Sequence, residues 1–302
     1  MKTESKQKLG AAKWSIYVNI FIIIIKLAAG IYTGSIGIIA EFIHSFFDLL
    51  ASLFAYIGIK QAAIPPDKSH HYGHDRFENF SSFLQSFLIA LTALFIIYES
   101  YQKITTKEHI VTQGIIGIIV MIITFIIDYK IAHYLHHKSI ETGSPALEAD
   151  AYHFTTDLLS TAAVILGLIA TMAGYPIADV IAAIIVAFVM LYISLRLGKK
   201  AIVVMLDQAP DEQTTERIAQ CIAQFPNIKG YHALRARTAG NRIFIDVKIH
   251  LSNDLTLKKA HEIADQLEME LIDKFPDIKE AVIHMEPEDH AIEPLVLKSF
   301  FD

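Results

Sequence analysis

Hydrophobic residues in this chain are gathered into six long runs within its first two thirds. The runs cover about residues 13–33, 36–61, 79–101, 113–136, 146–173 and 177–197. Each is close to the roughly 20 apolar residues that an α-helix needs to cross the hydrocarbon core of a bilayer. They therefore predict six transmembrane helices, and the very short connections near 34–35 and 174–176 predict two helical hairpins.

After residue 205 the pattern changes to short amphipathic segments. Helical spacing is expected over 211–225 and 255–274, and strands are expected over 228–238, 242–251 and 278–286. The order helix–strand–strand–helix–strand predicts a ferredoxin-like α+β fold, with two helices packed on one three-stranded sheet. The predicted organisation is a six-helix membrane domain over 1–204, a cytoplasmic domain over 205–290 and a tail over 291–302.

The composition agrees with a membrane protein. Of 302 residues, 53% are hydrophobic and only 19% are charged, and charged residues are scarce in the first two thirds of the chain. The net charge of −6 argues against nucleic acid as a partner. The single cysteine, Cys221, excludes an intrachain disulfide and a cysteine-based zinc cluster.

Lysine and arginine residues lie mainly on one side of the predicted membrane. That side holds Lys2, Lys6, Lys8, Lys13, Lys60, Lys68, Arg76, Lys130, Lys138, Arg196, Lys199 and Lys200. The other side holds Lys103 and Lys107. Because positive residues are retained in the cytoplasm, both termini are expected there, in a multi-pass protein of the plasma or inner membrane.

Two matching ionisable repeats interrupt the apolar runs. They read Glu41-Phe-Ile-His44-Ser-Phe-Phe-Asp48 in the second run and Asp150-Ala-Tyr-His153-Phe-Thr-Thr-Asp157 in the fifth. A histidine and an aspartate four residues apart share one helix face. Ionisable groups inside a membrane are expensive and mark binding sites or ion paths. The repeats therefore predict one functional site between the two helices.

This predicted site has four ligands: His44, Asp48, His153 and Asp157. Imidazole nitrogen and carboxylate oxygen suit a tetrahedral Zn²⁺ site, and two aspartates balance the charge of a divalent ion. Glu41 and Asp150 are weaker candidates for supporting or access roles. Asp128 and Asp179 either form structural ion pairs or line the path.

Proton exchange follows from the same ligands. Histidine must lose its proton to bind a metal, so protons and metal compete for the site. The sequence has no G-x-x-x-x-G-K-[ST] loop and gives no support to direct ATP drive. The expected activity is secondary active transport rather than enzymatic catalysis, with H⁺ as the counter-ion.

Two further histidine clusters lie outside the apolar runs. Asp67, His70 and His74 can converge in the loop after the second run, although the neighbouring His71 leaves the identity of the loop ligands open. In the last strand, His284 and Glu286 share a face because they are two residues apart. The candidate ligands of the cytoplasmic domain are His232, His250, His261, His284 and Glu286.

Over essentially its whole length the sequence resembles the cation diffusion facilitator family. The resemblance rests on both His-x-x-x-Asp pairs, the loop from Pro66 to Arg76, Leu206-Asp207 and the C-terminal domain. It implies a homodimer that exports divalent metal from the cytoplasm in exchange for protons, by alternating access. It also implies a transport site, a loop site and a cytoplasmic-domain site on the residues named above, and a charge interlock between Arg76 and Asp207.

Departures from the family pattern bear on the metal. Many bacterial members carry aspartate at the position of His44, so this chain has a more nitrogen-rich site that favours Zn²⁺ over Mn²⁺. Glu286 stands where aspartate is usual, which weakens the case for the cytoplasmic site. Mn²⁺, Fe²⁺, Co²⁺ and Cd²⁺ remain alternative cargoes. An intramembrane metalloenzyme and a non-transporting metal sensor are less favoured, since four protein ligands close the zinc shell and no H-E-x-x-H motif occurs.

Overall fold

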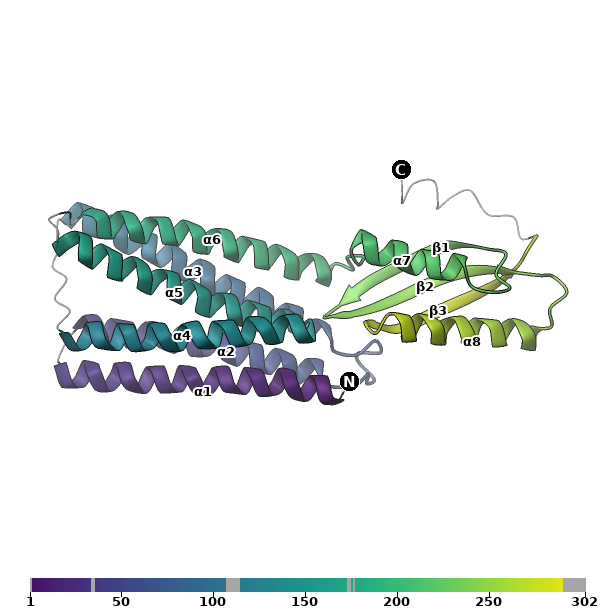
Figure 1. The fold of residues 1–302 in the computed structure, drawn as a ribbon, viewed down its shortest axis with the longest axis horizontal. Coiled ribbons are helices and arrows are strands. Elements are labelled where there is room, and N and C mark those ends of the chain that lie inside the picture. The colour runs from purple at the N-terminus through teal and green to yellow at the C-terminus, as the bar shows by residue number, and fades with distance from the viewer. Residues whose placement is uncertain (1, 34–35, 107–114, 173–174, 176, 290–302) are drawn as a thin grey trace. The chain divides into compact units, whose positions relative to one another are not determined.

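The computed structural model describes residues 2–33, 36–106, 115–172, 175 and 177–289 (Figure 1). The chain forms two compact units, Met1–Ile202 and Val203–Asp302. The first is all-helical and the second is a small α+β unit, so the predicted fold class is confirmed. The expected turns at 34–35 and 174–176 (apart from Tyr175), Lys107 and the tail over 291–302 lie outside the described residues.

Six long helices build the first unit. They are α1 (Lys2–Thr33), α2 (Ile36–Ala62), α3 (Arg76–Thr106), α4 (Ile115–Thr142), α5 (Pro145–Met172) and α6 (Ile177–Met205). Among the described residues, four of these helices are long and apolar enough to cross a membrane, namely α1, α3, α4 and α6. The other two, α2 and α5, are the helices that carry the ionisable repeats.

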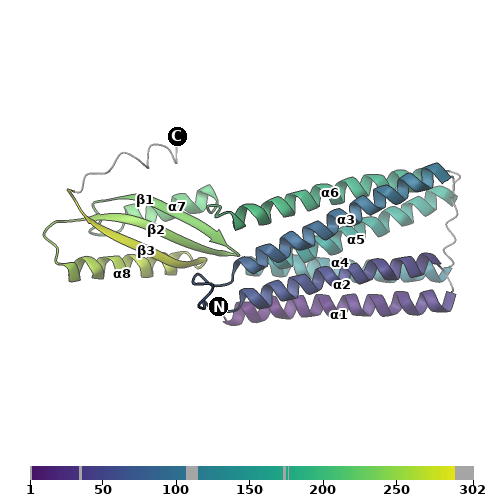
Figure 2. The same ribbon diagram turned by 180° about the vertical axis from the view of Figure 1, so that it is seen from behind.

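Two groups of helices share apolar contacts within this unit. In Figures 1 and 2, α1, α2 and α4 lie towards one side, and α3 and α6 lie towards the other. One core joins α1, α2, α4 and α5 through Ala11, Ala12, Ile59, Ile131, Ala132, Leu135, Ala146, Leu147, Ala151 and Phe154. A second core joins α3 to α6 through Ile89, Ala93, Met190 and Leu197. The first core places the histidine-bearing helices α2 and α5 in one packed group.

Helix α1 begins well before the apolar run that predicted it. The polar arm from Lys2 continues the helix, because Lys8 is buried and its ammonium donates to Glu78 Oε1 of α3 at 2.9 Å. A buried ion pair compensates the expense of removing both charges from water. Hydrophobicity alone could not locate this helix start.

The second unit contains α7 (Glu212–Ala223), β1 (Gly230–Ala239), β2 (Arg242–Leu251), α8 (Leu257–Lys274) and β3 (Ile278–Pro287). The sheet order is β1-β2-β3, with β1 antiparallel and β3 parallel to the central β2. Asp211 and Thr256 cap α7 and α8 by accepting from backbone amides.

Alternation along β2 separates the two faces of this sheet. Ile245, Val247 and Ile249 join Leu267 and Ile222 of the helices in one buried core. Residues 244, 246, 248 and 250 therefore point to the opposite face. The polar and histidine side chains of the strand lie on that second face.

A close approach between α2 and α3 gives a test of this packing. A Cβ atom added at Gly58 would lie 2.4 Å from Ser81 Cβ, so one helix must move. We expect Gly58→Ala to destabilise the bundle by about 1–3 kcal/mol, the usual penalty of overpacking. Thermal unfolding of the detergent-solubilised protein would measure it.

The matched control is Gly10→Ala in α1. Nothing lies within 4 Å of the position of its added Cβ. Alanine is about 0.5–1 kcal/mol more favourable than glycine within a helix, so this variant should be as stable as the parent or slightly more stable. Equal melting temperatures for Gly58→Ala and the parent would contradict the close packing of α2 on α3.

Candidate metal centres

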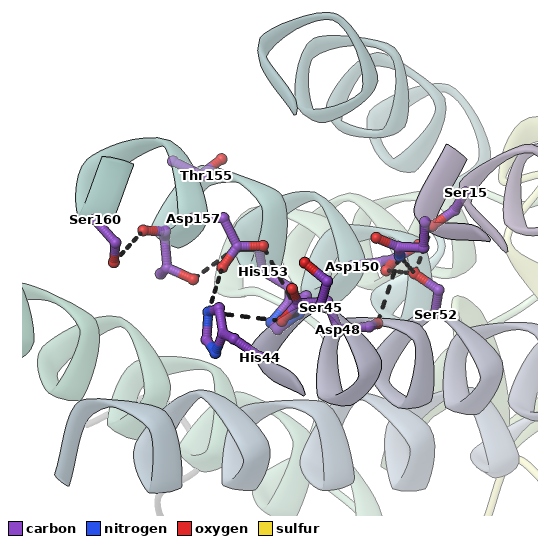
Figure 3. Close-up of polar contacts among 12 residues, drawn as sticks. Ser15, His44, Ser45, Asp48, Ser52, Asp150, His153, Thr155, Asp157 and Ser160 are labelled. Carbon is purple, nitrogen blue, oxygen red and sulfur yellow. Dashed lines mark hydrogen bonds and ion pairs between the residues drawn. The ribbon is translucent and has the colours of Figure 1, made fainter. Parts of the chain in front are cut away.

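The structure brings the two ionisable repeats together between α2 and α5 (Figure 3). His153 Nε2 lies 3.2 Å from Asp48 Oδ1 and 3.9 Å from Asp157 Oδ2. His44 Nε2 lies 3.9 Å from both Asp48 Oδ1 and Asp157 Oδ1. His44, Asp48 and Asp157 offer ligand atoms within 4.8 Å of one another, and His153 adjoins this group through both aspartates. The two imidazoles and two carboxylates are a donor set that suits a tetrahedral divalent metal.

Burial differs sharply among these four side chains. His153, Asp48 and Asp157 are 4%, 8% and 13% exposed, whereas His44 is 32% exposed. His153 Nδ1 is buried and has no hydrogen-bond partner among the described residues, and the other ring nitrogen, Nε2, faces the two aspartates.

A network of polar side chains continues from this site along α2 and α5. Ser52 Oγ donates to Asp150 Oδ1 at 2.9 Å and accepts from Asn19 Nδ2 at 2.8 Å. Ser15 Oγ lies 2.6 Å from Ser52 Oγ. These contacts join α1 to both ligand-bearing helices, one helical turn from Asp48. Asp150 is thereby placed as a neighbour of the quartet rather than as one of its members.

The other intramembrane groups are placed less directly. Lys26 of α1 donates to Ser45 Oγ at 2.9 Å, beside His44. Asp128 is buried on α4. The side chains of Glu41 and Asp179 lie outside the described part of the structure, so their expected roles stay predictions.

A second cluster forms in the loop between α2 and α3. Asp67, His70 and His74 each offer a ligand atom, and these atoms lie within 4.8 Å of one another. Asp67 Oδ1 accepts from the backbone amides of Ser69 and His70, both at 2.8 Å, and from the Ser69 hydroxyl. These donors hold the pKa of Asp67 well below its usual range, so the carboxylate is ionised at neutral pH and can attract a cation.

The loop turns back on itself at Gly73, whose φ of 90° favours glycine. This turn places His74 at the start of α3, where its ring is buried and Nδ1 has no hydrogen-bond partner within the described segments. His71 is exposed and is not one of the three grouped side chains. Of the two neighbouring histidines, the geometry selects His70.

A buried network anchors the helix that follows this loop. Glu78 in the first turn of α3 accepts from Lys8 of α1 and from the hydroxyl of Ser144, which precedes α5. Ser144 Oγ also accepts from the backbone amide of Leu147 at 3.3 Å, as a helix-capping residue does. Three helices are therefore tied together within four residues of His74.

The third cluster lies on the sheet of the second unit. His232, His250 and Glu286 offer ligand atoms within 4.8 Å of one another. His232 Nδ1 is 2.8 Å from His250 Nε2, and His232 Nε2 is 3.4 Å from Glu286 Oε2. His284 Nε2 lies 3.4 Å from Glu286 Oε1, at the edge of the cluster. Three of the five predicted ligands are thus grouped, and a fourth is adjacent.

His261 is not brought into this cluster. It lies on α8, is 66% exposed and lies 3.5 Å from Asp265 one helical turn later. The core side of α8 packs on the sheet face opposite to the one that carries His250. Sequence analysis placed His261 with the other histidines because it could not assign sheet faces.

The predicted partners Arg76 and Asp207 belong to different units. Within its own unit, Asp207 lies 3.5 Å from Arg237 Nη1. Its backbone φ of 62° is unusual for a residue other than glycine. The interlock between Arg76 and Asp207 stays a prediction.

Comparison with known proteins covers both units. The model of the cation efflux transmembrane domain matches residues 12–206, and that of the cation efflux protein cytoplasmic domain matches 210–288. The cation-efflux pump FieF of Klebsiella pneumoniae is 29% identical over 281 residues, which cover 93% of this chain and 92% of that protein. The FieF pump of Shewanella oneidensis is 31% identical over 277 residues, covering 92% and 93%.

Solved structures show a more limited likeness. The structure of CzrB in its Zn form is 29% identical and covers 29% of this chain and 99% of its own, with a TM-score of 0.27.

The two adjacent histidines of the loop provide a matched test of the loop cluster. We expect His70→Ala to lower zinc affinity at this loop by about 10–100-fold, the range found even for groups that only support metal ligands. His71→Ala should leave the affinity unchanged. Equilibrium zinc titration of the full-length protein, with Asp157→Asn and Glu286→Gln in the background to disable the intramembrane and cytoplasmic sites, would compare them. Equal effects of the two substitutions would contradict the selection of His70.

Proposed function

We propose that this chain, which belongs to the cation diffusion facilitator family of divalent-metal efflux transporters, exports Zn²⁺ from the cytoplasm in exchange for protons. The observation that carries the proposal is the convergence of two histidines and two aspartates between α2 and α5. All four are on helices of a membrane unit, where ionisable groups are expensive and mark binding sites or ion paths. The protein acts as a transporter rather than as an enzyme.

The donor set supports zinc as the cargo. Two imidazole nitrogens and two carboxylate oxygens match the ligands that Zn²⁺ prefers, whereas Mn²⁺ prefers oxygen ligands. The two carboxylates neutralise the ion, so the filled site carries no net charge in a medium that penalises charge. Fe²⁺, Co²⁺ and Cd²⁺ are the alternative cargoes for the same site.

Proton exchange is supported by the contact between His153 and Asp48. His153 Nε2 is 3.2 Å from Asp48 Oδ1, so a proton on this nitrogen can be donated to a carboxylate. Binding of zinc requires the same nitrogen in its deprotonated form. Each metal that enters therefore displaces protons, and each metal that leaves is replaced by them.

Alternating access is supported by the position of the site within the bundle. The quartet lies among helices that share one core, and the polar side chains Ser15, Asn19 and Ser52 follow it towards the N-terminal end of α1. With the termini in the cytoplasm of a plasma or inner membrane, this buried polar stretch lies between the quartet and the cytoplasmic end of α1. A shift of α2 and α5 relative to their neighbours would then expose the quartet to one side at a time.

The remaining sites are assigned to assembly and regulation. The C-terminal unit matches the cytoplasmic domain of cation efflux proteins, and we infer that it pairs two protomers into a homodimer. Metal at Asp67, His70 and His74, and at His232, His250 and Glu286, would report the cytoplasmic metal level. The Arg76–Asp207 interlock would hold the two protomers together near the membrane surface.

Zinc flux in reconstituted vesicles tests the transport site. The vesicles are prepared with the cytoplasmic face of the protein outside and with a lumen more acidic than the medium. This pH gradient should drive zinc into the lumen, and the pH of the lumen should rise as zinc enters. Asp48→Asn and Asp157→Asn should each lower the flux by at least about 10–100-fold. Glu148→Gln is the matched control, because Glu148 pairs with the exposed Lys200 at 2.5 Å, away from the quartet. Full flux in both aspartate variants, or flux without proton movement, would sink the proposal.

His44 gives a separate test of metal choice. Replacement by aspartate turns the donor set into one nitrogen and three oxygens, which suits harder metals. We expect His44→Asp to lower the ratio of zinc flux to manganese flux by about tenfold, since one exchanged ligand is worth on the order of 1.4 kcal/mol. An unchanged ratio, measured metal by metal in the same vesicles, would show that His44 does not set the preference.

A further inference from the structure

Three ionisable side chains stand in one row across the sheet of the second unit. The register pairs His232 of β1 with Lys248 of β2, and Lys248 with His284 of β3. The next row on the same face pairs His250 of β2 with Glu286 of β3. Lys248 therefore lies between His232 and His284. It belongs to β2, the strand that lies between β1 and β3 in Figure 2.

Lys248 is in direct contact with the only carboxylate of that cluster. Its Nζ lies 2.9 Å from Glu286 Oε1, closer than either neighbouring histidine is to the same carboxyl group. The Glu286 side chain is only 6% exposed. A buried carboxylate needs a compensating cation, and in the metal-free protein the lysine ammonium provides it.

We propose that Lys248 is a built-in competitor of the metal at the cytoplasmic site and sets the metal concentration at which the site fills. The inference rests on the proposed regulatory binding of divalent metal to His232, His250 and Glu286. Glu286 Oε2 faces His232 while Oε1 contacts the ammonium, so a divalent cation on Oε2 would share one carboxylate with Lys248 and would be repelled by it. Metal binding therefore favours release of the ammonium into water.

The side chain of Lys248 is suited to this exchange. It is 43% exposed, so its flexible four-carbon stem can move the ammonium into water without disturbing the hydrophobic core. The exchange also leaves room for a further ligand. His284 Nε2 is 3.4 Å from the same Oε1, and the His284 side chain is 62% exposed. Departure of the lysine allows His284 to approach the metal that replaces it.

The exchange has a consequence for the metal-free domain. Because Lys248 compensates Glu286, the cluster does not require metal to avoid a buried, unbalanced charge. The domain is expected to be folded at low metal concentration and to gain metal only above a threshold. A site without the lysine would bind metal more tightly and would fill at lower concentrations.

Metal titration of the full-length protein tests the role of Lys248. The background carries Asp157→Asn and Asp67→Asn, so that only the cytoplasmic site is read, and Zn²⁺ is the probe. We expect Lys248→Gln to tighten zinc binding by about tenfold, the effect of removing one ion pair and one repelling charge near a partly exposed site. Lys248→Arg keeps the charge and should bind zinc no more tightly than the background protein.

The matched control is Lys259→Gln. Lys259 pairs with Glu262 at 3.8 Å on α8, away from the cluster, so its loss should leave zinc affinity unchanged. Lys248→Gln should also lower the melting temperature of the metal-free protein and increase the stabilisation produced by zinc. Unchanged or weaker zinc binding in Lys248→Gln would overturn the proposal.

A last variant tests the cytoplasmic metal site independently of the role of Lys248. Glu286→Gln should abolish the remaining zinc binding in the same background. If it does, and Lys248→Gln still binds zinc like the background protein, only the competitor role is wrong. If Glu286→Gln leaves zinc binding intact, the cytoplasmic site itself is wrong and the competitor role falls with it. Zinc flux, measured with an intact transport site, tests the transport proposal separately, and neither titration result decides it.

Discussion

A buried charge must be compensated, and the architecture of this protein depends on that constraint. Removing a carboxylate from water is tolerable only with a cation or several hydrogen-bond donors close by. In the membrane unit, Asp48 and Asp157 face each other's histidines across α2 and α5. The closest of these contacts, His153 to Asp48 at 3.2 Å, joins the two helices, so the ligands of the site are also part of what holds the helices in register.

The same constraint is met differently in three parts of the chain. At one end of the bundle, the ammonium of Lys8 permanently compensates Glu78. On the sheet of the second unit, Lys248 compensates Glu286 from a position at which it can still reach solvent. Between α2 and α5, the compensating charges under the proposed function are metal and protons from solution. Under that proposal, the permanence of the cation distinguishes a structural pair, a regulatory pair and a transport site.

Much of the fold could be predicted because the lengths of the hydrophobic runs and the spacing of apolar residues determine the helices and strands. The six helices and the order of the C-terminal elements follow from apolar runs, alternation and turn residues. The matching repeats around His44 and His153 indicated which residues would meet, since one helix face joins each histidine to its aspartate. The helical arm before residue 13 was missed because its stabilisation comes from Glu78, which is far away in the sequence.

The details of the ligand sets could not be read from residue types. Whether His70 or His71 turns towards Asp67 depends on the turn at Gly73, and whether His261 joins the sheet cluster depends on which face α8 covers. Lys248 was overlooked because a lysine is not a metal ligand. Its spacing of two residues from His250 was the available signal, since it places both side chains on one face of β2.

The capping of α5 by Ser144 constrains how that helix can move. Through Glu78, this end of α5 is tied to α1 and α3, so a tilt of α5 pivots about the anchored end. At about 1.5 Å of rise per residue, His153 and Asp157 lie roughly 13 and 20 Å from the pivot. Any tilt therefore displaces Asp157 about half as far again as His153. Such a tilt would separate Asp157 from the ligands of α2 before it separates His153 from them.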